Sequence, residues 1–295
     1  MMQMQVLTRF TGHKGSVYAI EPGPDGTFFT SGSEGIIAQW NPADPESGAM
    51  LARVPGVVYS LCFLDDKVLL AGTAQGKVHV IDLNLRREVR LLQYHSSPVF
   101  RLAFWEQQNL FFSLAGDGSV QVYDAALNPI YAWRASEGKL RTITFADDYF
   151  ILGTSEGKIL RYSSAFALLN SYQAHQDNFG VNALWLNKSL LVSGGRDAHL
   201  IVSDPISGEI LQSVPAHNYA IYRIAPMSGN PEIMATASRD KTVKLWHTNT
   251  MEPLLRLDAA VGGHTNSVND LTWLNPGLLV SAGDDRSAVA WTIDL

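Results

Sequence analysis

The stretch "ATASRDKTVKLWH" (residues 235–247) joins a run of small and apolar residues to an alternating run that ends on an aromatic residue, through the polar segment "SRDK". Alternation with a period of two is typical of a β-strand with one buried face. Polar residues between two such runs are typical of a tight turn. The stretch therefore predicts a β-hairpin. The same shape recurs as "TSGSEGIIAQW", "AGTAQGKVHVI", "SLAGDGSVQVY", "LGTSEGKILRY", "SGGRDAHLIVS" and "SAGDDRSAVAW".

The seven copies follow one another at a nearly constant spacing. A fixed period of this kind is the sequence signature of a repeat architecture. Each period has room for four short strands, and no segment of about 10–15 residues has helical periodicity, so we expect an all-β protein. The intervals between the last residues of the copies are 41, 42, 39, 41, 43 and 45 residues. These last residues are Trp40, Ile81, Tyr123, Tyr162, Ser203, Trp246 and Trp291.

Three features of the repeats make a recognisable combination. Gly-His pairs precede two repeats, tryptophans end three strands, and Ser/Thr…Asp…Trp arrangements lie between them. The residues are Gly12-His13, Gly263-His264, Trp40, Trp246 and Trp291. With them the chain resembles the WD-repeat family along essentially its whole length. The resemblance implies one domain over residues 1–295, a seven-bladed β-propeller whose blades are four-stranded antiparallel sheets around a central channel.

The two ends of the chain predict how the ring closes. The segment "QVLTRF" is a strand directly before His13, and the chain stops four residues after Trp291 with no strand beyond that repeat. The N-terminal strand can therefore complete the last blade as its outermost member, which leaves no open blade. We expect residues 1–10 to be part of the fold.

Five of the eight histidines precede the first strand of a repeat, a position that raises the alternatives of a metal site or catalysis. The resemblance implies a structural role, in which each histidine bonds an acid in the turn between the second and third strands, backed by a hydroxyl and a tryptophan. Repeats 2 and 4 lack the histidine and the hydroxyl together, as expected if a half-satisfied buried network is costly. The histidines are His13, His95, His175, His217 and His264; the acids are Glu34, Asp117, Asp197, Asp240 and Asp285; the hydroxyls are on Thr30, Ser113, Ser193, Thr236 and Ser281.

No motif of an enzyme or a cofactor site occurs in its required context. The segment "GTSEG" (153–157) has the Gly-x-Ser-x-Gly pattern of a hydrolase nucleophile elbow, which requires a following helix. It occupies the same place as "GTAQG" (72–76) in repeat 2, so we interpret Ser155 as a turn residue. Cys62 is the only cysteine, which excludes an intrachain disulfide, and we interpret it as a packing residue. We therefore expect no catalytic residue, no cofactor and no metal.

The composition excludes other classes of partner. A net charge of −6 without a basic face argues against nucleic acid. No apolar stretch approaches about 18 residues, so we expect no membrane partner. The only adjacent arginines, Arg86-Arg87, lack the surroundings of a phosphoinositide site. A monomeric protein of the cytoplasm is expected.

The first strands of the repeats predict a binding surface. They align as "SVYAI", "VVYSL", "PVFRL", "KLRTI", "GVNAL", "AIYRI" and "SVNDL", with aliphatic second and fifth residues. The gap of three residues between these two aliphatic positions breaks strict alternation, which indicates a β-bulge or a late strand start. The residues between the two positions would then be turned toward the channel mouth. The third positions are Tyr18, Tyr59, Phe100, Arg141, Asn182, Tyr222 and Asn269.

Four aromatics and an arginine among seven such positions are the residue types enriched at interface hot spots. Loops before first strands and turns between second and third strands must share one face, and Lys139, Arg141, Arg196 and Arg239 make part of that face basic. We predict a non-enzymatic protein-interaction scaffold. Its partner segment would place an apolar anchor over Tyr18, Tyr59, Phe100 and Tyr222 and an acidic portion toward the cations.

Two alternatives remain at this point. In the first, the aromatic residues merely plug the channel and pack between blades. In the second, the channel mouth binds a small molecule or acts on it. The second alternative requires convergent titratable groups in a pocket, and the mouth positions offer mainly Arg141 with Lys139 beside it.

Overall fold

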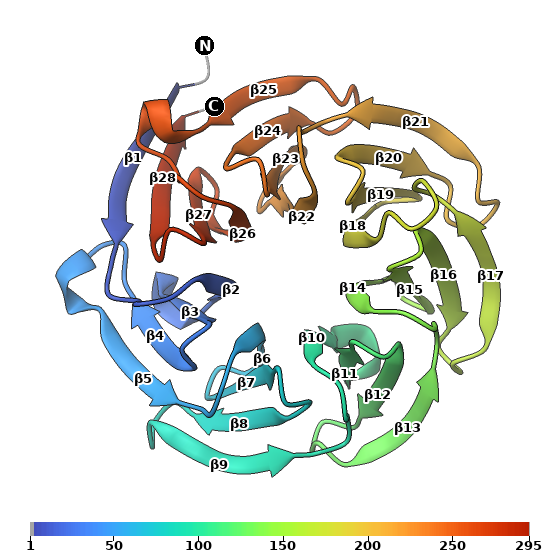
Figure 1. Ribbon diagram of the computed structural model, residues 1–295, viewed down its shortest axis with the longest axis horizontal. Helices are drawn as coiled ribbons and strands as arrows, with labels where there is room; N and C mark the ends of the chain where they lie inside the picture. The colour runs from blue at the N-terminus through green and yellow to red at the C-terminus, as the bar shows by residue number, and fades with distance from the viewer. Residues whose placement is uncertain (1–2, 295) are drawn as a thin grey trace.

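The computed structural model describes residues 3–294, which form seven four-stranded antiparallel sheets arranged as blades around a central channel (Figure 1). This confirms the predicted all-β, seven-bladed propeller. In blades 1 to 6 the chain runs from the innermost strand, at the channel, to the outermost strand, at the rim. Between residues 3 and 294, no helix is long and apolar enough to cross a membrane.

The first four blades follow one another along the chain. Blade 1 consists of β2 (Val17–Pro22), β3 (Phe28–Gly32), β4 (Ile36–Trp40) and β5 (Ala49–Arg53). Blade 2 consists of β6 (Val58–Asp65), β7 (Val68–Thr73), β8 (Val78–Asp82) and β9 (Arg87–Leu92). Blade 3 consists of β10 (Val99–Trp105), β11 (Leu110–Ala115), β12 (Ser119–Tyr123) and β13 (Pro129–Arg134). Blade 4 consists of β14 (Leu140–Phe145), β15 (Tyr149–Thr154), β16 (Lys158–Ser163) and β17 (Leu168–Gln173).

The last three blades complete the ring. Blade 5 consists of β18 (Val181–Asn187), β19 (Leu190–Gly195), β20 (His199–Ser203) and β21 (Ile210–Pro215). Blade 6 consists of β22 (Ile221–Met227), β23 (Asn230–Ser238), β24 (Val243–His247) and β25 (Pro253–Leu257). Blade 7 consists of β26 (Val268–Asn275), β27 (Leu278–Gly283), β28 (Ala288–Asp294) and β1 (Gln3–Phe10). Short 3-10 helices lie at η1 (Pro24–Gly26), η2 (Pro45–Ser47), η3 (Glu106–Gln108) and η4 (Ala259–Val261).

The ring closes through its two ends. Strand β1 pairs antiparallel with β28, with Val6 opposite Trp291, and so becomes the outermost strand of blade 7 (Figure 1). Phe10 at its end is 3% exposed and its ring centroid lies 5.0 Å from that of Phe28 in blade 1. The predicted closure is confirmed for residues 3–10; residues 1 and 2 lie outside the described part. Pairing the two ends removes the open edge that an unclosed last blade would present.

The innermost strand of every blade carries a one-residue bulge near its start. In blade 1 the register passes from Val17 opposite Gly32 to Ala19 opposite Ser31, which leaves Tyr18 without a partner in the ladder. A bulge re-aims the side chain of the extra residue. Of the two explanations offered for the broken alternation, the bulge is correct. The extra residues of the other blades are Tyr59, Phe100, Arg141, Asn182, Tyr222 and Asn269.

The hydrophobic core is a ring of seven clusters, each shared by two neighbouring blades. Between blades 3 and 4, for example, the fully buried ring of Trp105 stacks on Phe145 with centroids 5.3 Å apart. Because both faces of a blade are covered by its neighbours, the strands alternate less strictly than strands of a one-sided sheet. Removing one blade would therefore expose two apolar faces.

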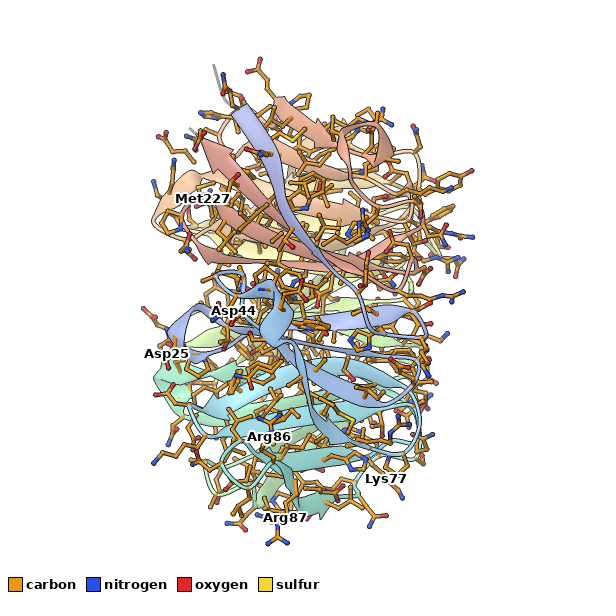
Figure 2. All side chains as sticks on the ribbon, turned by 90° about the vertical axis from the view of Figure 1, so that its left-hand side faces the viewer. Asp25, Asp44, Lys77, Arg86, Arg87 and Met227 are labelled. Carbon is orange, nitrogen blue, oxygen red and sulfur yellow. The ribbon has the colours of Figure 1, made fainter. Side chains whose placement is uncertain are left out.

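The two faces of the ring carry different connections. In the edge-on view of Figure 2, Asp25 in η1, between the first and second strands of blade 1, lies on one face. Lys77, between the second and third strands of blade 2, lies on the other. The loop before β6 reaches the same face, since the amide of Ala74 donates to the carbonyl of Val57 at 2.9 Å. We call this second face the mouth face.

Candidate functional site at the channel mouth

Buried side-chain networks hold the loops of the mouth face. In blade 6, His217 Nδ1 lies 2.9 Å from Asp240 Oδ2 and His217 Nε2 lies 2.7 Å from Thr236 Oγ1. Trp246 Nε1 donates to the same hydroxyl at 2.9 Å. Blades 1, 5 and 7 repeat the histidine–acid–hydroxyl contacts, and a tryptophan completes them in blades 1 and 7. The residues are His13, Glu34, Thr30 and Trp40; His175, Asp197 and Ser193; and His264, Asp285, Ser281 and Trp291.

Blade 3 departs from the predicted network. His95 Nδ1 lies 2.8 Å from Ser119 Oγ, and that hydroxyl donates to Asp117 Oδ1 at 2.6 Å. The direct bond predicted between His95 and Asp117 is therefore wrong, because Ser119 at the start of β12 stands between them. Tyr123 takes the place of the tryptophan, with its hydroxyl 3.3 Å from Ser113 Oγ.

Two acids of these networks, Asp240 and Asp285, are strongly stabilised as carboxylates. Burial alone would raise the pKa of Asp240, but hydrogen bonds from His217, Thr242 and the amide of Asn218 outweigh it and hold that pKa well below its usual range. The pKa of Asp285 is lowered against the effect of burial in the same way, by its bonds from His264 and Ser287. These carboxylates therefore stay charged at all ordinary pH values.

The five network histidines have both ring nitrogens within hydrogen-bonding distance of the chain's own side chains. A metal ligand needs a ring nitrogen free to donate its lone pair. Over residues 3–294, moreover, no group of three or more His, Cys, Asp or Glu side chains is placed to hold a metal ion. These contacts fit a structural role for the five histidines.

The segment "GTSEG" forms the turn between β15 and β16, and no helix follows it. Ser155 Oγ donates to Glu156 Oε1 at 3.1 Å. The structure explains why both positions are glycine. A Cβ on Gly153 would lie 2.7 Å from Thr142 and 2.8 Å from Val181, and Gly157 has φ +87°, where residues with a side chain are strained. Ser155 is a turn residue, as predicted.

All ten residues predicted to bind a partner line one cavity of about 540 Å³ at the channel mouth. Three of its aromatic rings form an arc, with ring centroids 5.6 Å apart for Tyr18 and Tyr59 and 5.0 Å apart for Tyr59 and Phe100. The arc continues into blade 4, where Arg141 Cζ lies 4.1 Å from the Phe100 centroid. These aromatics line an open cavity rather than fill it. The ten residues are Tyr18, Tyr59, Phe100, Lys139, Arg141, Asn182, Arg196, Tyr222, Arg239 and Asn269.

Tyr222 stands apart from the other three aromatics. It projects from blade 6, and within residues 3–294 no aromatic ring packs against its ring. The expected apolar anchor over four rings is therefore an arc of three with a fourth tyrosine in another wall of the cavity.

Four cations of the cavity rim carry unbalanced charge. Lys139, Arg141, Arg196 and Arg239 are exposed, and no carboxylate in the described chain lies within 4.0 Å of their charged nitrogens. The cavity is therefore basic in a protein whose net charge is −6. A concave basic wall attracts anionic ligands more strongly than a flat one, because low-dielectric protein focuses the field.

The two asparagines of the rim hold neighbouring blades together. Asn182 Nδ2 donates to the carbonyl of Ile221 at 2.9 Å. Asn269 Nδ2 donates at 2.9 Å to the carbonyl of Val17 and at 2.8 Å to Asp284 Oδ1. These bonds satisfy backbone groups at the inner edge of the next blade. The sequence did not predict this role.

The prediction from the sequence also did not include a layer of charged residues below the rim. Arg101, Arg223 and Asp270 line the cavity, each directly after a bulge residue. Arg223 Nε lies 3.2 Å from Asp270 Oδ1, and Asp270 Oδ2 accepts the amide of Ile20 at 2.9 Å. The signal was available, because these residues are the fourth letters of "PVFRL", "AIYRI" and "SVNDL".

Two further titratable groups border this layer. Glu21 Oε1 accepts the amide of Phe63 at 3.2 Å, and burial raises the pKa of Glu21 to about 7. Burial also raises the pKa of the Cys62 thiol far above its usual range, which makes the reactive thiolate rare at neutral pH. Cys62 packs in the core between blades 2 and 3, as expected for a packing residue.

The adjacent arginines lie elsewhere. Figure 2 shows Arg86 and Arg87 on the outer side of blade 2, away from the mouth face marked by Lys77. Arg86 Nη2 donates to the carbonyl of Met50 in blade 1 at 2.9 Å. One of the two arginines is thus used within the protein.

Comparisons with known proteins agree with this architecture. Residues 4–41, 208–247 and 255–292 match the family model described as "WD domain, G-beta repeat". The chain is a seven-bladed β-propeller that contains WD repeats. The match to residues 4–41 begins in β1 of blade 7 and ends with β4 of blade 1, so a sequence repeat is offset by one strand from a blade.

Similar proteins include the serine-threonine kinase receptor-associated proteins of Rattus norvegicus and Homo sapiens. Each is 26% identical over 244 residues, which cover 81% of this chain and 69% of the relative. The WD repeat-containing protein 26 homolog of Drosophila melanogaster is 37% identical over 83 residues, 27% of this chain and 12% of that protein. The crystal structure of the WD40 β-propeller domain of Doa1 superposes with a TM-score of 0.87 at 16% identity, over 99% of this chain and 97% of that one. At that identity the likeness concerns the fold.

Proposed function

We propose that this propeller is a non-enzymatic protein-interaction scaffold and that its partner binds in the mouth cavity. The observation that carries the proposal is the composition of that cavity. An arc of three neighbouring aromatic rings, tilted against one another, lies beside four exposed cations that have no acid partner in the described chain. Aromatic residues and arginine are the types that dominate binding energy at protein interfaces.

The partner segment follows from these surfaces. An apolar side chain would pack on the arc of Tyr18, Tyr59 and Phe100, and an acidic portion would face Lys139, Arg141, Arg196 and Arg239. The rim is pre-organised, because the histidine networks fix the loops that carry it. A rigid surface loses little conformational entropy on binding.

The comparisons support the class of function. The relatives that cover most of this chain are named for their association with a serine-threonine kinase receptor, which is another protein. We propose that residues 1–295 likewise act as one domain that binds a protein, as a monomer in the cytoplasm and without nucleic acid. The net charge of −6 and the single cysteine support this setting.

Affinity capture from a lysate of the native cells tests the proposal. The bait is the wild type or a Tyr18→Ala, Phe100→Ala, Tyr222→Ala variant whose circular dichroism and melting temperature are unchanged. A matched control carries Ile130→Ala, Leu168→Ala and Leu211→Ala, three exposed apolar residues on the outermost strands β13, β17 and β21. We expect proteins held by the wild type to be lost from the mouth variant and retained by the outer control.

The pattern of loss decides the outcome. Proteins captured equally by the wild type and the mouth variant, but lost from the outer control, would move the binding surface to the rim of the blades. Loss of a small-molecule ligand instead of a protein, detected by mass spectrometry of the released material, would favour the small-molecule alternative. Either result would contradict the proposed scaffold face.

A further inference from the structure

The floor of the mouth cavity holds a guanidinium group without a partner. Arg101 follows the bulge residue Phe100 in β10 and lines the cavity. Its side chain makes no hydrogen bond and no ion pair with residues 3–294, although it offers five N–H donors. Arg101 is half-buried and its side-chain nitrogens reach the solvent of the cavity, so its donors are available to a ligand. The protein has therefore kept a donor group at the floor that nothing of its own satisfies.

The charges around Arg101 are not balanced at neutral pH. Burial, and then the nearby positive charge of Arg223, lower the pKa of Arg101 to about 10, so the Arg101 guanidinium stays protonated. Asp270 is paired with Arg223 and already accepts backbone amides. Glu21, the other nearby acid, is only partly ionised near pH 7. The floor therefore carries positive charge in addition to that of the rim.

The walls above the floor add neutral donors. The phenol hydroxyls of Tyr18, Tyr59 and Tyr222 line the cavity and make no hydrogen bond within the described chain. A phenol hydroxyl donates one hydrogen bond to an acceptor. A ligand group with several acceptor oxygens and negative charge would satisfy the tyrosines and Arg101 together.

We propose that the floor of the mouth cavity binds one oxyanion group, a carboxylate or a phosphoryl group, on Arg101 beneath the tyrosine hydroxyls. The inference rests on the proposed function in one respect, since we assign the group to a side chain of the partner segment that enters the channel. The guanidinium fork matches the paired oxygens of either group, and an anion close to a charged donor forms short, strong hydrogen bonds.

Free anions test the site without the partner. Inorganic phosphate and acetate are titrated separately into the protein labelled with ¹⁵N-arginine, and the Nε–Hε signals of Arg101 and Arg223 are followed by NMR. We expect saturable shifts of both signals with at least one of the anions. The anion with the lower dissociation constant is the one whose geometry the site favours. The two titrations thus also distinguish a phosphorylated from an acidic partner segment.

Variants locate the binding. Arg101→Met keeps an unbranched side chain, removes the guanidinium and is expected to weaken anion binding at least tenfold, whereas Arg101→Lys retains part of it because the charge remains. Arg53→Met is the matched control, since Arg53 is exposed, outside the cavity and without a side-chain hydrogen bond or ion pair in the described chain. Should Arg101→Met fail to fold, the Arg101→Lys variant and the Arg223 signal carry the same comparison.

Two results would overturn the inference. One is the absence of a saturable shift at Arg101 in the wild type with either anion. The other is anion binding that survives Arg101→Met but is lost in an Arg196→Met, Arg239→Met variant, which would assign it to the rim. Capture of a protein by the wild type would stand in both cases, so failure of this site is distinguishable from failure of the proposed function.

Discussion

Arg141 Cζ of blade 4 lies 4.1 Å from the centroid of the Phe100 ring of blade 3, so a cation and an aromatic ring join two blades at the channel mouth. Both residues occupy the bulge of their innermost strand. The contact links the apolar arc to the basic wall. Lys139 approaches the same ring, with Nζ 6.0 Å from its centroid.

A double-mutant cycle measures this contact. We expect Phe100→Leu and Arg141→Met to be coupled by about 0.5–1 kcal/mol in the free energy of unfolding, the range of a cation–π pair at an exposed site. Chemical unfolding of the two single variants and the double variant gives the coupling. Additive effects of the two substitutions would contradict it.

The closure of the ring predicts unequal effects along β1. Phe10→Ala removes a ring that is 3% exposed and packs on Phe28 and Trp40, so we expect a loss of about 3–5 kcal/mol in unfolding free energy. Leu7→Ala, in the same strand, changes a side chain that is 48% exposed and should cost below about 1 kcal/mol. Thermal and denaturant unfolding compare the two. Equal losses would mean that β1 does not seal the ring through Phe10.

The Asp240 network predicts a dependence on acid pH. Its pKa is lower in the folded than in the unfolded protein, so its contribution to stability is present above about pH 4 and is lost as the pH falls further. Asp240→Asn should lower the unfolding free energy by about 1–3 kcal/mol at pH 7. The difference from the wild type should shrink below pH 4, as followed by circular dichroism during urea unfolding. Asp44→Asn, at an exposed residue, is the control, and a difference that stays constant down to pH 2.5 would be contrary evidence.

The raised pKa of Glu21 predicts a pH dependence of stability with the opposite sign. Its folded pKa of about 7 is above its unfolded value, so folding disfavours its ionised form and stability falls as the pH rises from about 4.5 to 7. The groups around it are Arg101, Arg223, Asp270 and Cys62. Glu21→Gln should match the wild type near pH 4.5 and exceed it by about 2–3 kcal/mol at pH 8.

The measurement is the free energy of unfolding at several pH values between 4.5 and 8. Glu232→Gln removes the same charge from an exposed residue and should leave the pH profile unchanged. Parallel profiles for the wild type and Glu21→Gln would mean that Glu21 ionises as easily in the folded protein as in the unfolded chain.

The repeat and the bulge could be predicted from the sequence because both are local. A period near forty residues sets the number of blades, and a three-residue gap between aliphatic positions marks the extra residue of each innermost strand. The ten mouth residues could then be assigned to one place without coordinates, because ring geometry brings equivalent positions together.

The remaining features depend on contacts between blades. Asn182 reaches the carbonyl of Ile221, and Asp270 reaches the amide of Ile20, across distances in sequence that no repeat pattern specifies. The bond from His95 to Ser119 was missed because the pattern fixes residue types but not which of two adjacent polar groups a ring nitrogen meets. The charge on Arg101 was visible in the sequence, yet its lack of a partner was not.

The bulge separates two kinds of evolutionary change. A bulge residue such as Tyr18 has no partner in the ladder, while Val17 and Ile20 beside it are buried in the packing between blades. Asn182 and Asn269 bond the next blade, but substitutions at the other five bulge positions can change the wall of the cavity with little effect on folding. Positions of this kind, all on one side of a constant framework, would let descendants of one chain acquire different ligands without rebuilding a blade.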